Sequence, residues 1–193
     1  MMVTLDGVMQ APGGPKEDTS GGFKYGGWTA PYSDEAMGYI IKKELSVPFD
    51  LLLGRKTYDI WKGYWPKQTG FIADPFNKAK KYVVSEKGLD LNWKESILIS
   101  GDVSAKIKAL KKDEGPVFHV WGSSVLIQTL LKNDLLDELR LRIYPVTIGT
   151  GKRLFGEGTI PAAFKLMDSL ALRSGVILAN YKREGEFKTG SVV

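Results

Sequence analysis

Apolar positions recur in two periods along the chain, and the change of period marks the predicted elements. Short apolar runs predict buried strands, at 49–53, 81–85, 97–99 and 117–120. Apolar residues at helical spacing predict helices, at 34–45, 54–61, 104–112 and 123–131. Longer runs predict three further strands, at 137–146, 164–173 and 176–183. Strand and helix therefore alternate before the chain changes to long strands.

This order predicts an α/β fold: a mixed, mainly parallel central sheet flanked by helices, with antiparallel strands at the C-terminal end. A chain of 193 residues favours a single domain over 1–193. Parallel sheets bind ligands at the carboxyl ends of their strands. The polar turns that follow three predicted strands are therefore candidate ligand contacts, at 54–57, at Ser85 and at 122–124.

A long loop is expected over 7–33, where seven glycines and three prolines fall within 27 residues. Connections of this length inside a domain are usually functional loops or lids. Only five residues precede Asp6, so the first strand is expected to be short or incomplete at its edge. After the loop, Ser33 is the predicted N-cap of the next helix, with Asp34 and Glu35 in its first turn.

Composition narrows the chemistry. The chain has no cysteine and one histidine, which excludes disulfides, cysteine nucleophiles and multi-histidine metal sites, and no metal is expected. No apolar run approaches the roughly 20 residues that span a bilayer, and no leader pattern precedes a cleavage site, so we expect a cytoplasmic protein without membrane contact. The net charge of +5 is spread along the chain, which disfavours a nucleic-acid partner.

Two turns carry the pattern of a phosphate site. The first, Gly54-Arg55-Lys56-Thr57, offers a glycine, two cations and a hydroxyl at a helix start, although it is equally a helix start with solvated basic residues. The second, Gly122-Ser123-Ser124, repeats the glycine and hydroxyls. Together they could hold the phosphates of one dinucleotide, and we expect Thr57 and Ser123 to lie on the same side of the molecule.

Other candidate residues have a structural alternative. Asp6 and Asp34 could face a cleft, or they could stabilise a turn and a helix end. A third glycine turn, at 148–153, is either a chain reversal or a ligand contact. His119 is expected in the core or at a sheet edge, and the lysines at 78, 80 and 81 on a solvated face. Trp28, Trp61 and Trp65 are either core residues or walls of an aromatic site.

Several motifs occur together and in order along nearly the whole chain: Thr4-Leu5-Asp6-Gly7-Val8, Gly54-Arg55-Lys56-Thr57-Tyr58, Tyr82-Val83-Val84-Ser85, Gly122-Ser123-Ser124-Val125-Leu126, Leu135-Leu136-Asp137-Glu138-Leu139 and the run from Pro145 to Phe155. In this arrangement the sequence resembles the dihydrofolate-reductase-like superfamily. The branch it is most similar to is the reductase domain of the bifunctional riboflavin-biosynthesis deaminase-reductase.

The resemblance implies a cofactor, NADPH, and residues to hold it. Residues Gly54, Arg55, Lys56 and Thr57 would cradle phosphates, Ser85 would lie near the adenosine 2′-phosphate, Gly122, Ser123, Ser124 and Leu126 would hold the pyrophosphate, and Gly149 and Gly151 would border the same groove. It also implies Asp6 or Asp34 as the source of a proton, Trp28 beside the substrate, and a homodimer. Trp121 stands where many relatives carry a glycine, and the deaminase half, which needs cysteines, is absent.

With the phosphate turns, the resemblance implies an NADPH-dependent reductase that transfers a hydride to a small heterocyclic substrate, pterin-like or a ribosylated pyrimidine, or to a carbonyl substrate. The 7–33 loop would close over the site and exclude water. The alternative is a non-catalytic nucleotide-binding protein that has kept the phosphate turns. A nucleic-acid binder is the least supported reading, because Lys and Arg are not gathered on one segment.

Overall fold

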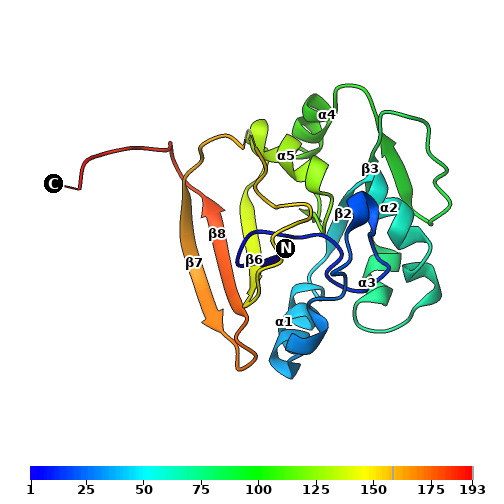
Figure 1. Ribbon diagram of the computed structural model, residues 1–193. Coiled ribbons are helices and arrows are strands. Elements are labelled where there is room, and N and C mark those ends of the chain that lie inside the picture. The colour runs from blue at the N-terminus through cyan, green and yellow to red at the C-terminus, as the bar shows by residue number, and fades with distance from the viewer. Residues whose placement is uncertain (158, 193) are drawn as a thin grey trace.

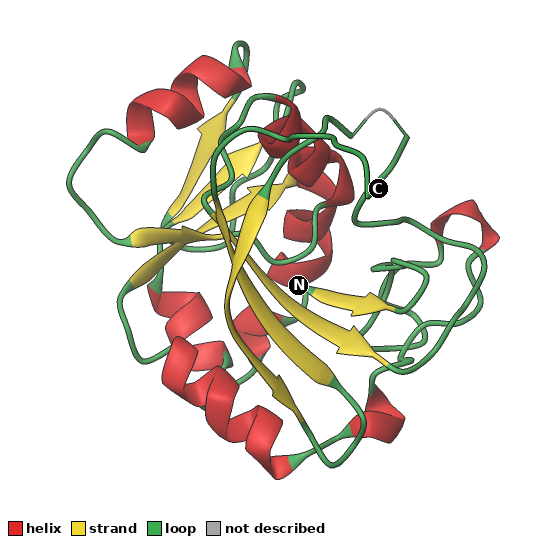
Figure 2. Cartoon of the chain, turned by 90° about the vertical axis from the view of Figure 1, so that its left-hand side faces the viewer, coloured by secondary structure: helices red, strands yellow, loops and turns green. Residues whose placement is uncertain are grey.

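Within residues 1–157 and 159–192, which the computed structural model describes, the strands form two four-stranded sheets (Figure 1). The strands are β1 Met2–Thr4, β2 Phe49–Gly54, β3 Lys81–Val84, β4 Ser96–Ile99, β5 Val117–His119, β6 Glu138–Tyr144, β7 Phe164–Ala171 and β8 Ile177–Arg183. The α-helices are α1 Glu35–Glu44, α2 Arg55–Lys62, α3 Ala73–Lys78, α4 Val103–Leu110 and α5 Ser124–Lys132. Figure 2 shows the helices around the outside of the strands.

One sheet is wholly parallel, with the strand order β4-β3-β2-β5. Its central strand β2 is buried along almost its whole length, as an apolar run covered on both faces should be. The other sheet is mixed, with the order β1-β6-β8-β7, in which β1 runs parallel to β6 and the remaining pairs are antiparallel. The predicted α/β fold is confirmed, with the sheet hydrogen bonds divided between a parallel and a mixed sheet.

Helix α1 begins one residue later than the sequence pattern indicated. Asp34, not Ser33, is the N-cap, and its carboxylate accepts a hydrogen bond of 2.8 Å from the amide of Ala36. The apolar spacing places Met37 and Ile41 in the core. Helix α3 was not predicted, because it is only six residues long and contains Pro75 within its first turn, where proline is tolerated.

The expectation that the lysines at 78, 80 and 81 share a solvated face is wrong for Lys81. Strand β3 starts at Lys81, so neighbouring side chains point to opposite faces, and Lys81 is 0% exposed while Lys80 is exposed. The Lys81 ammonium donates to the carbonyls of Asn77 and Lys94 at 2.7 and 3.0 Å. It also lies 4.6 Å from the centre of the Trp93 ring, and its burial lowers its pKa to about 8.

The glycine-rich loop over 7–33 packs against the hydrophobic core. Val8, Phe23 and Trp28 are buried, and the indole of Trp28 donates to the carbonyl of Gln10 at 2.8 Å. The loop is also tied to the segment after β6, since the amide of Met9 donates to the carbonyl of Lys152 at 2.8 Å. The described residues contain no helix long and apolar enough to cross a membrane.

Candidate functional site

The two predicted phosphate turns meet. The hydroxyl of Ser123 donates to the hydroxyl of Thr57 at 2.8 Å and accepts the amide of Gly54, also at 2.8 Å. These contacts join residues more than sixty positions apart in the sequence, because β2 and β5 are neighbours in the parallel sheet and both turns leave its carboxyl edge. The expectation that Thr57 and Ser123 lie on the same side of the molecule is confirmed.

Backbone geometry explains why the second turn contains a glycine. Gly122 has a φ of +75°, and a Cβ there would lie 3.4 Å from the hydroxyl oxygen of Thr57. Ser123 itself has φ 65° and ψ 60°, the left-handed conformation that costs a non-glycine residue about 1–2 kcal/mol. The hydrogen bonds of its hydroxyl hold it there, and α5 begins at the next residue.

A cavity of about 1260 Å³ opens at this junction. Its volume exceeds the range of about 300–1,000 Å³ that holds a typical small ligand, so the cavity is large enough for an extended ligand. It brings together nine of the predicted cofactor residues: Gly54, Arg55, Lys56, Thr57, Ser85, Gly122, Ser123, Ser124 and Leu126. Their cofactor-binding role stays a prediction.

The two predicted glycines of the third turn are placed differently. The amide of Gly149 donates to the carboxylate of Asp6 at 2.7 Å. Gly151 packs against the loop, where a Cβ would come within 2.8 Å of the Phe23 ring. Neither glycine is among the residues that line the cavity, whereas the neighbouring Lys152 is.

Asp6 lies outside the cavity lining and is held as a carboxylate. It accepts hydrogen bonds from the Thr4 hydroxyl at 2.5 Å and from the amides of Gly149 and Ile148, with Arg153 at 3.7 Å. The Thr4 hydrogen bond, followed by those amides, lowers the pKa of Asp6. Through these hydrogen bonds Asp6 connects the end of β1 to the turn at 148–149.

Asp34 and Trp28 are also placed away from the cavity lining. Asp34 caps α1, as described above. Trp28, a buried residue of the 7–33 loop, lies edge-on to Tyr144 with ring centres 5.2 Å apart. The catalytic role nominated for Asp6 and Asp34 and the substrate role nominated for Trp28 remain predictions.

The loop contributes cavity residues that no sequence pattern indicated. Gln10, Glu17 and Asp18 line the cavity beside the α2 turn. Burial raises the pKa of Glu17, whose carboxylate accepts the amide of Gly13 at 2.7 Å. The sequence predicted a lid over the site, but no periodicity within a glycine-rich loop indicates which of its residues face the site.

Another part of the cavity lining is aromatic. Trp61 stacks on Phe76 with ring centres 5.0 Å apart, and Trp65 and Trp121 meet the same phenylalanine edge-on at 5.1 and 5.6 Å. Flat, apolar walls of this kind suit a planar ring. Trp61 and Trp65 were expected either in the core or in the wall of an aromatic site, and each does both, since it packs against the core and lines the cavity.

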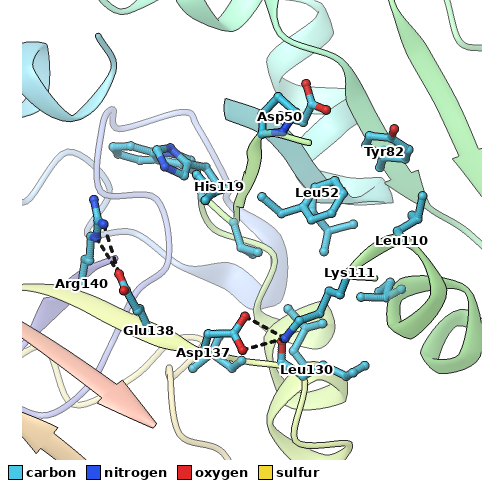
Figure 3. A pocket seen from close by; sticks show the side chains of 18 of the residues that line it. Asp50, Leu52, Tyr82, Leu110, Lys111, His119, Leu130, Asp137, Glu138 and Arg140 are labelled. Atoms are coloured by element: carbon cyan, nitrogen blue, oxygen red, sulfur yellow. Dashed lines mark hydrogen bonds and ion pairs between the residues drawn. The ribbon is translucent and has the colours of Figure 1, made fainter. Parts of the chain in front are cut away.

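A second cavity, of about 640 Å³, lies between β5 and β6 (Figure 3). Its charged side chains largely pair with one another: Lys111 with Asp137 at 2.7 Å, and Arg140 with Glu138 at 3.1 Å. His119 lines it from the sheet edge and stacks on Phe49, which agrees with the expectation for this histidine. Burial, with Arg140 nearby, lowers the pKa of His119 to about 4. None of the predicted cofactor residues lines this cavity.

Among the described residues, no cluster of three or more histidine, aspartate or glutamate side chains could hold a metal ion. The chain has an α/β fold of the dihydrofolate-reductase-like type, with the larger of the two cavities at the carboxyl edge of a parallel sheet. The sequence matches the RibD C-terminal domain over residues 1–178, and the chain belongs to this family.

Individual proteins are similar to this chain in sequence or in fold. The chain is 31% identical over 140 residues to the uncharacterized protein YyaP of Bacillus subtilis, covering 70% of this chain and 74% of that protein. A pyrimidine reductase-like protein of Corynebacterium diphtheriae shares the fold with a TM-score of 0.64 and 14% identity, covering 96% of this chain and 90% of that one. The dihydrofolate reductase of Enterococcus faecalis, solved with NADP(H) and RAB-propyl, gives a TM-score of 0.61 at 14% identity, with 95% and 94% covered.

Proposed function

We propose that this protein is an NADPH-dependent reductase that acts on a small heterocyclic or carbonyl substrate. Membership of the RibD C-terminal domain family supports a reductase-type function. The observation that carries the proposal is the contact between Thr57 and Ser123, which joins two glycine- and hydroxyl-bearing helix starts at one large cavity. Because a helix N-terminus favours a phosphate, two of them at one cavity suit an extended ligand with several phosphates.

The residues at the junction fit the cofactor. Gly54 and Gly122 let the backbone approach a ligand closely, and α2 and α5 start beside them. Arg55 and Lys56 add positive charge, and Lys87 and Lys152 also line the cavity. Under this proposal Gly54–Thr57 and Gly122–Leu126 hold the phosphates, and Ser85 lies near the adenosine. When bound, the reduced nicotinamide supplies the hydride.

The chain's own residues supply orientation and shelter from water. The aromatic walls formed by Trp61, Trp65 and Trp121 hold a planar substrate ring, and the packed loop covers the cavity from the side of Gln10–Gly13. The reduced substrate must also gain a proton, for which the sequence nominates Asp6 and Asp34. The alternative function, nucleotide binding without turnover, uses the same phosphate residues and differs only in the absence of reduction.

Cofactor binding is tested by titrating NADPH and following its fluorescence. We expect a Kd of about 1 μM or lower, and binding about tenfold to a hundredfold weaker in Arg55→Ala, because a hydrogen bond to a charged group contributes about 1.5–3 kcal/mol. Arg173→Ala is the matched control, since Arg173 is exposed in the turn between β7 and β8 and does not line the cavity. Equal affinity in wild type and Arg55→Ala would remove the phosphate assignment.

Catalysis is tested by NADPH consumption with dihydropterins, ribosylated aminopyrimidines and simple carbonyl compounds. Turnover with any of them supports the reductase, and binding without turnover favours the alternative. Asp6→Asn and Asp34→Asn are then compared with wild type for rate and for thermal unfolding. A slower rate at unchanged stability supports a chemical role, whereas a loss of stability alone assigns the residue to the fold.

A further inference from the structure

Asp18 lies where three separate segments of the chain meet. Its carboxylate accepts from the ammonium of Lys56, in the first turn of α2, at 2.9 Å, and from the ammonium of Lys152 at 2.6 Å. The carboxylate is only 11% exposed, and all three side chains line the larger cavity. A carboxylate of the 7–33 loop thus occupies a position between two cations of the candidate cofactor site.

The surrounding hydrogen bonds attach Asp18 more firmly to Lys152 than to Lys56. The buried amide group of Gln10 donates to the carbonyls of Asp18 and Ser20 at 3.1 and 3.0 Å and accepts the amide of Lys152 at 3.0 Å. The contact with Lys56, by comparison, is the ion pair alone, and the side chain of Lys56 is 51% exposed. Lys56 is therefore the partner that can move.

Charge balance permits that movement. The three groups carry a net charge of +1, and Asp18 stays neutralised by Lys152 when Lys56 turns away. Burial opposes the charge of Asp18, but its hydrogen bonds from Lys152 and Lys56 outweigh that effect and hold its pKa well below the usual range. An anion entering beside Arg55 and Thr57 meets Lys56 already paired with another anion.

We propose that Asp18 is a positioning residue that competes with the phosphates of the dinucleotide for Lys56, so that ligand binding releases the 13–20 part of the loop from α2. This inference rests on the proposed function, because it takes the ligand to be a dinucleotide phosphate. Lys152 and Gln10 keep the released segment attached at its other side. The loop then responds to an occupied phosphate site without leaving the cavity.

The first test measures the affinity for inorganic pyrophosphate, which has the phosphates without the nicotinamide. Asp18→Asn should bind pyrophosphate about three- to tenfold more tightly at low salt, because it removes one negative charge a few ångströms from the anion. In a Lys56→Met background the same substitution should have a smaller effect. Asp168→Asn is the matched control, since it changes the net charge equally but lies on β7 and bonds Asn180.

The second test measures hydrogen exchange of the amides at 13–20. In wild type, pyrophosphate should speed their exchange, and in Lys56→Met they should exchange fast with or without it. Lys56→Met also serves if Asp18→Asn does not fold. Unchanged or weaker pyrophosphate binding by Asp18→Asn, slower loop exchange on binding, or no pyrophosphate binding by wild type would each overturn the proposal.

The two proposals fail separately. If wild type turns over NADPH but Asp18→Asn binds pyrophosphate with the affinity of wild type, the proposed competition for Lys56 is wrong and the proposed reductase function is unaffected. If the variants respond to pyrophosphate as expected but no NADPH turnover is found, the competition for Lys56 is supported and the reductase function is wrong.

Discussion

The contact between the two phosphate turns can be tested through Ser123 without any ligand. In Ser123→Ala the amide of Gly54 loses the hydroxyl that accepts it, and Thr57 loses its partner, while the left-handed backbone at φ 65° remains. Leaving one such group without its partner costs about 1–3 kcal/mol. Ser123→Gly loses the same hydrogen bonds but relieves a left-handed conformation that costs about 1–2 kcal/mol. The free energy of unfolding should therefore fall in the order wild type, Ser123→Gly, Ser123→Ala.

Urea unfolding at equilibrium measures this order, with the slope compared among variants to confirm that each unfolds in the same manner. Ser124→Ala is the control, because Ser124 starts α5 and no hydrogen bond of its side chain occurs among the described residues. It should stay within about 0.5 kcal/mol of wild type. The reasoning is refuted if Ser123→Ala unfolds like wild type, or if Ser123→Gly is less stable than Ser123→Ala.

Three further predictions concern other parts of the fold. Lys81 has a pKa of about 8 in the folded chain against 10.5 in the unfolded chain, so the unfolded state binds more protons between these two pH values. The free energy of unfolding should therefore rise with pH over this range, by up to about 1.4 kcal/mol per pH unit. Urea unfolding at several pH values should show this rise in wild type and not in Lys81→Met. Gly151→Ala should destabilise the fold by about 1–3 kcal/mol in thermal unfolding, because the new Cβ would lie 2.8 Å from the Phe23 ring and the backbone there has a φ of +111°. Gly38→Ala is the control: it lies in α1 with open space around it, so the substitution should stabilise the fold slightly. Glu17 lines the cavity and burial raises its pKa, so it is a further candidate proton donor. Where a substrate is found, Glu17→Gln should lower kcat about a hundredfold with little change in NADPH affinity, and equal rates in variant and wild type would count against this role.

The elements with strong periodicity were predictable from the sequence, and so were the turns that follow them. Strand β2 and helix α5 show why, since an apolar run and an apolar stripe each require a particular backbone. The approach of Thr57 and Ser123 followed from a general property of parallel sheets, because strand ends of one sheet share an edge.

The loop residues could not be placed by such reasoning. Asp18 contacts Lys152 across 134 positions and Gln10 bonds the amide of Lys152 across 142, so no local pattern carries either contact. Lys81 shows a related limit. Its sequence neighbourhood is basic and looks solvated, yet the register of β3 alone decides that its side chain points inward to two backbone carbonyls.

The same contacts bear on which acid could serve a reduction. A proton donor needs access to the cavity and an environment that favours its neutral form. Asp6 lies outside the cavity lining, and hydrogen bonds from Thr4 and two backbone amides favour its charged form. Glu17 lines the cavity, and its burial favours the neutral form. Glu17 therefore meets both conditions for a proton donor, and Asp6 meets neither. For this reason Glu17→Gln should be compared with Asp6→Asn in the turnover assay.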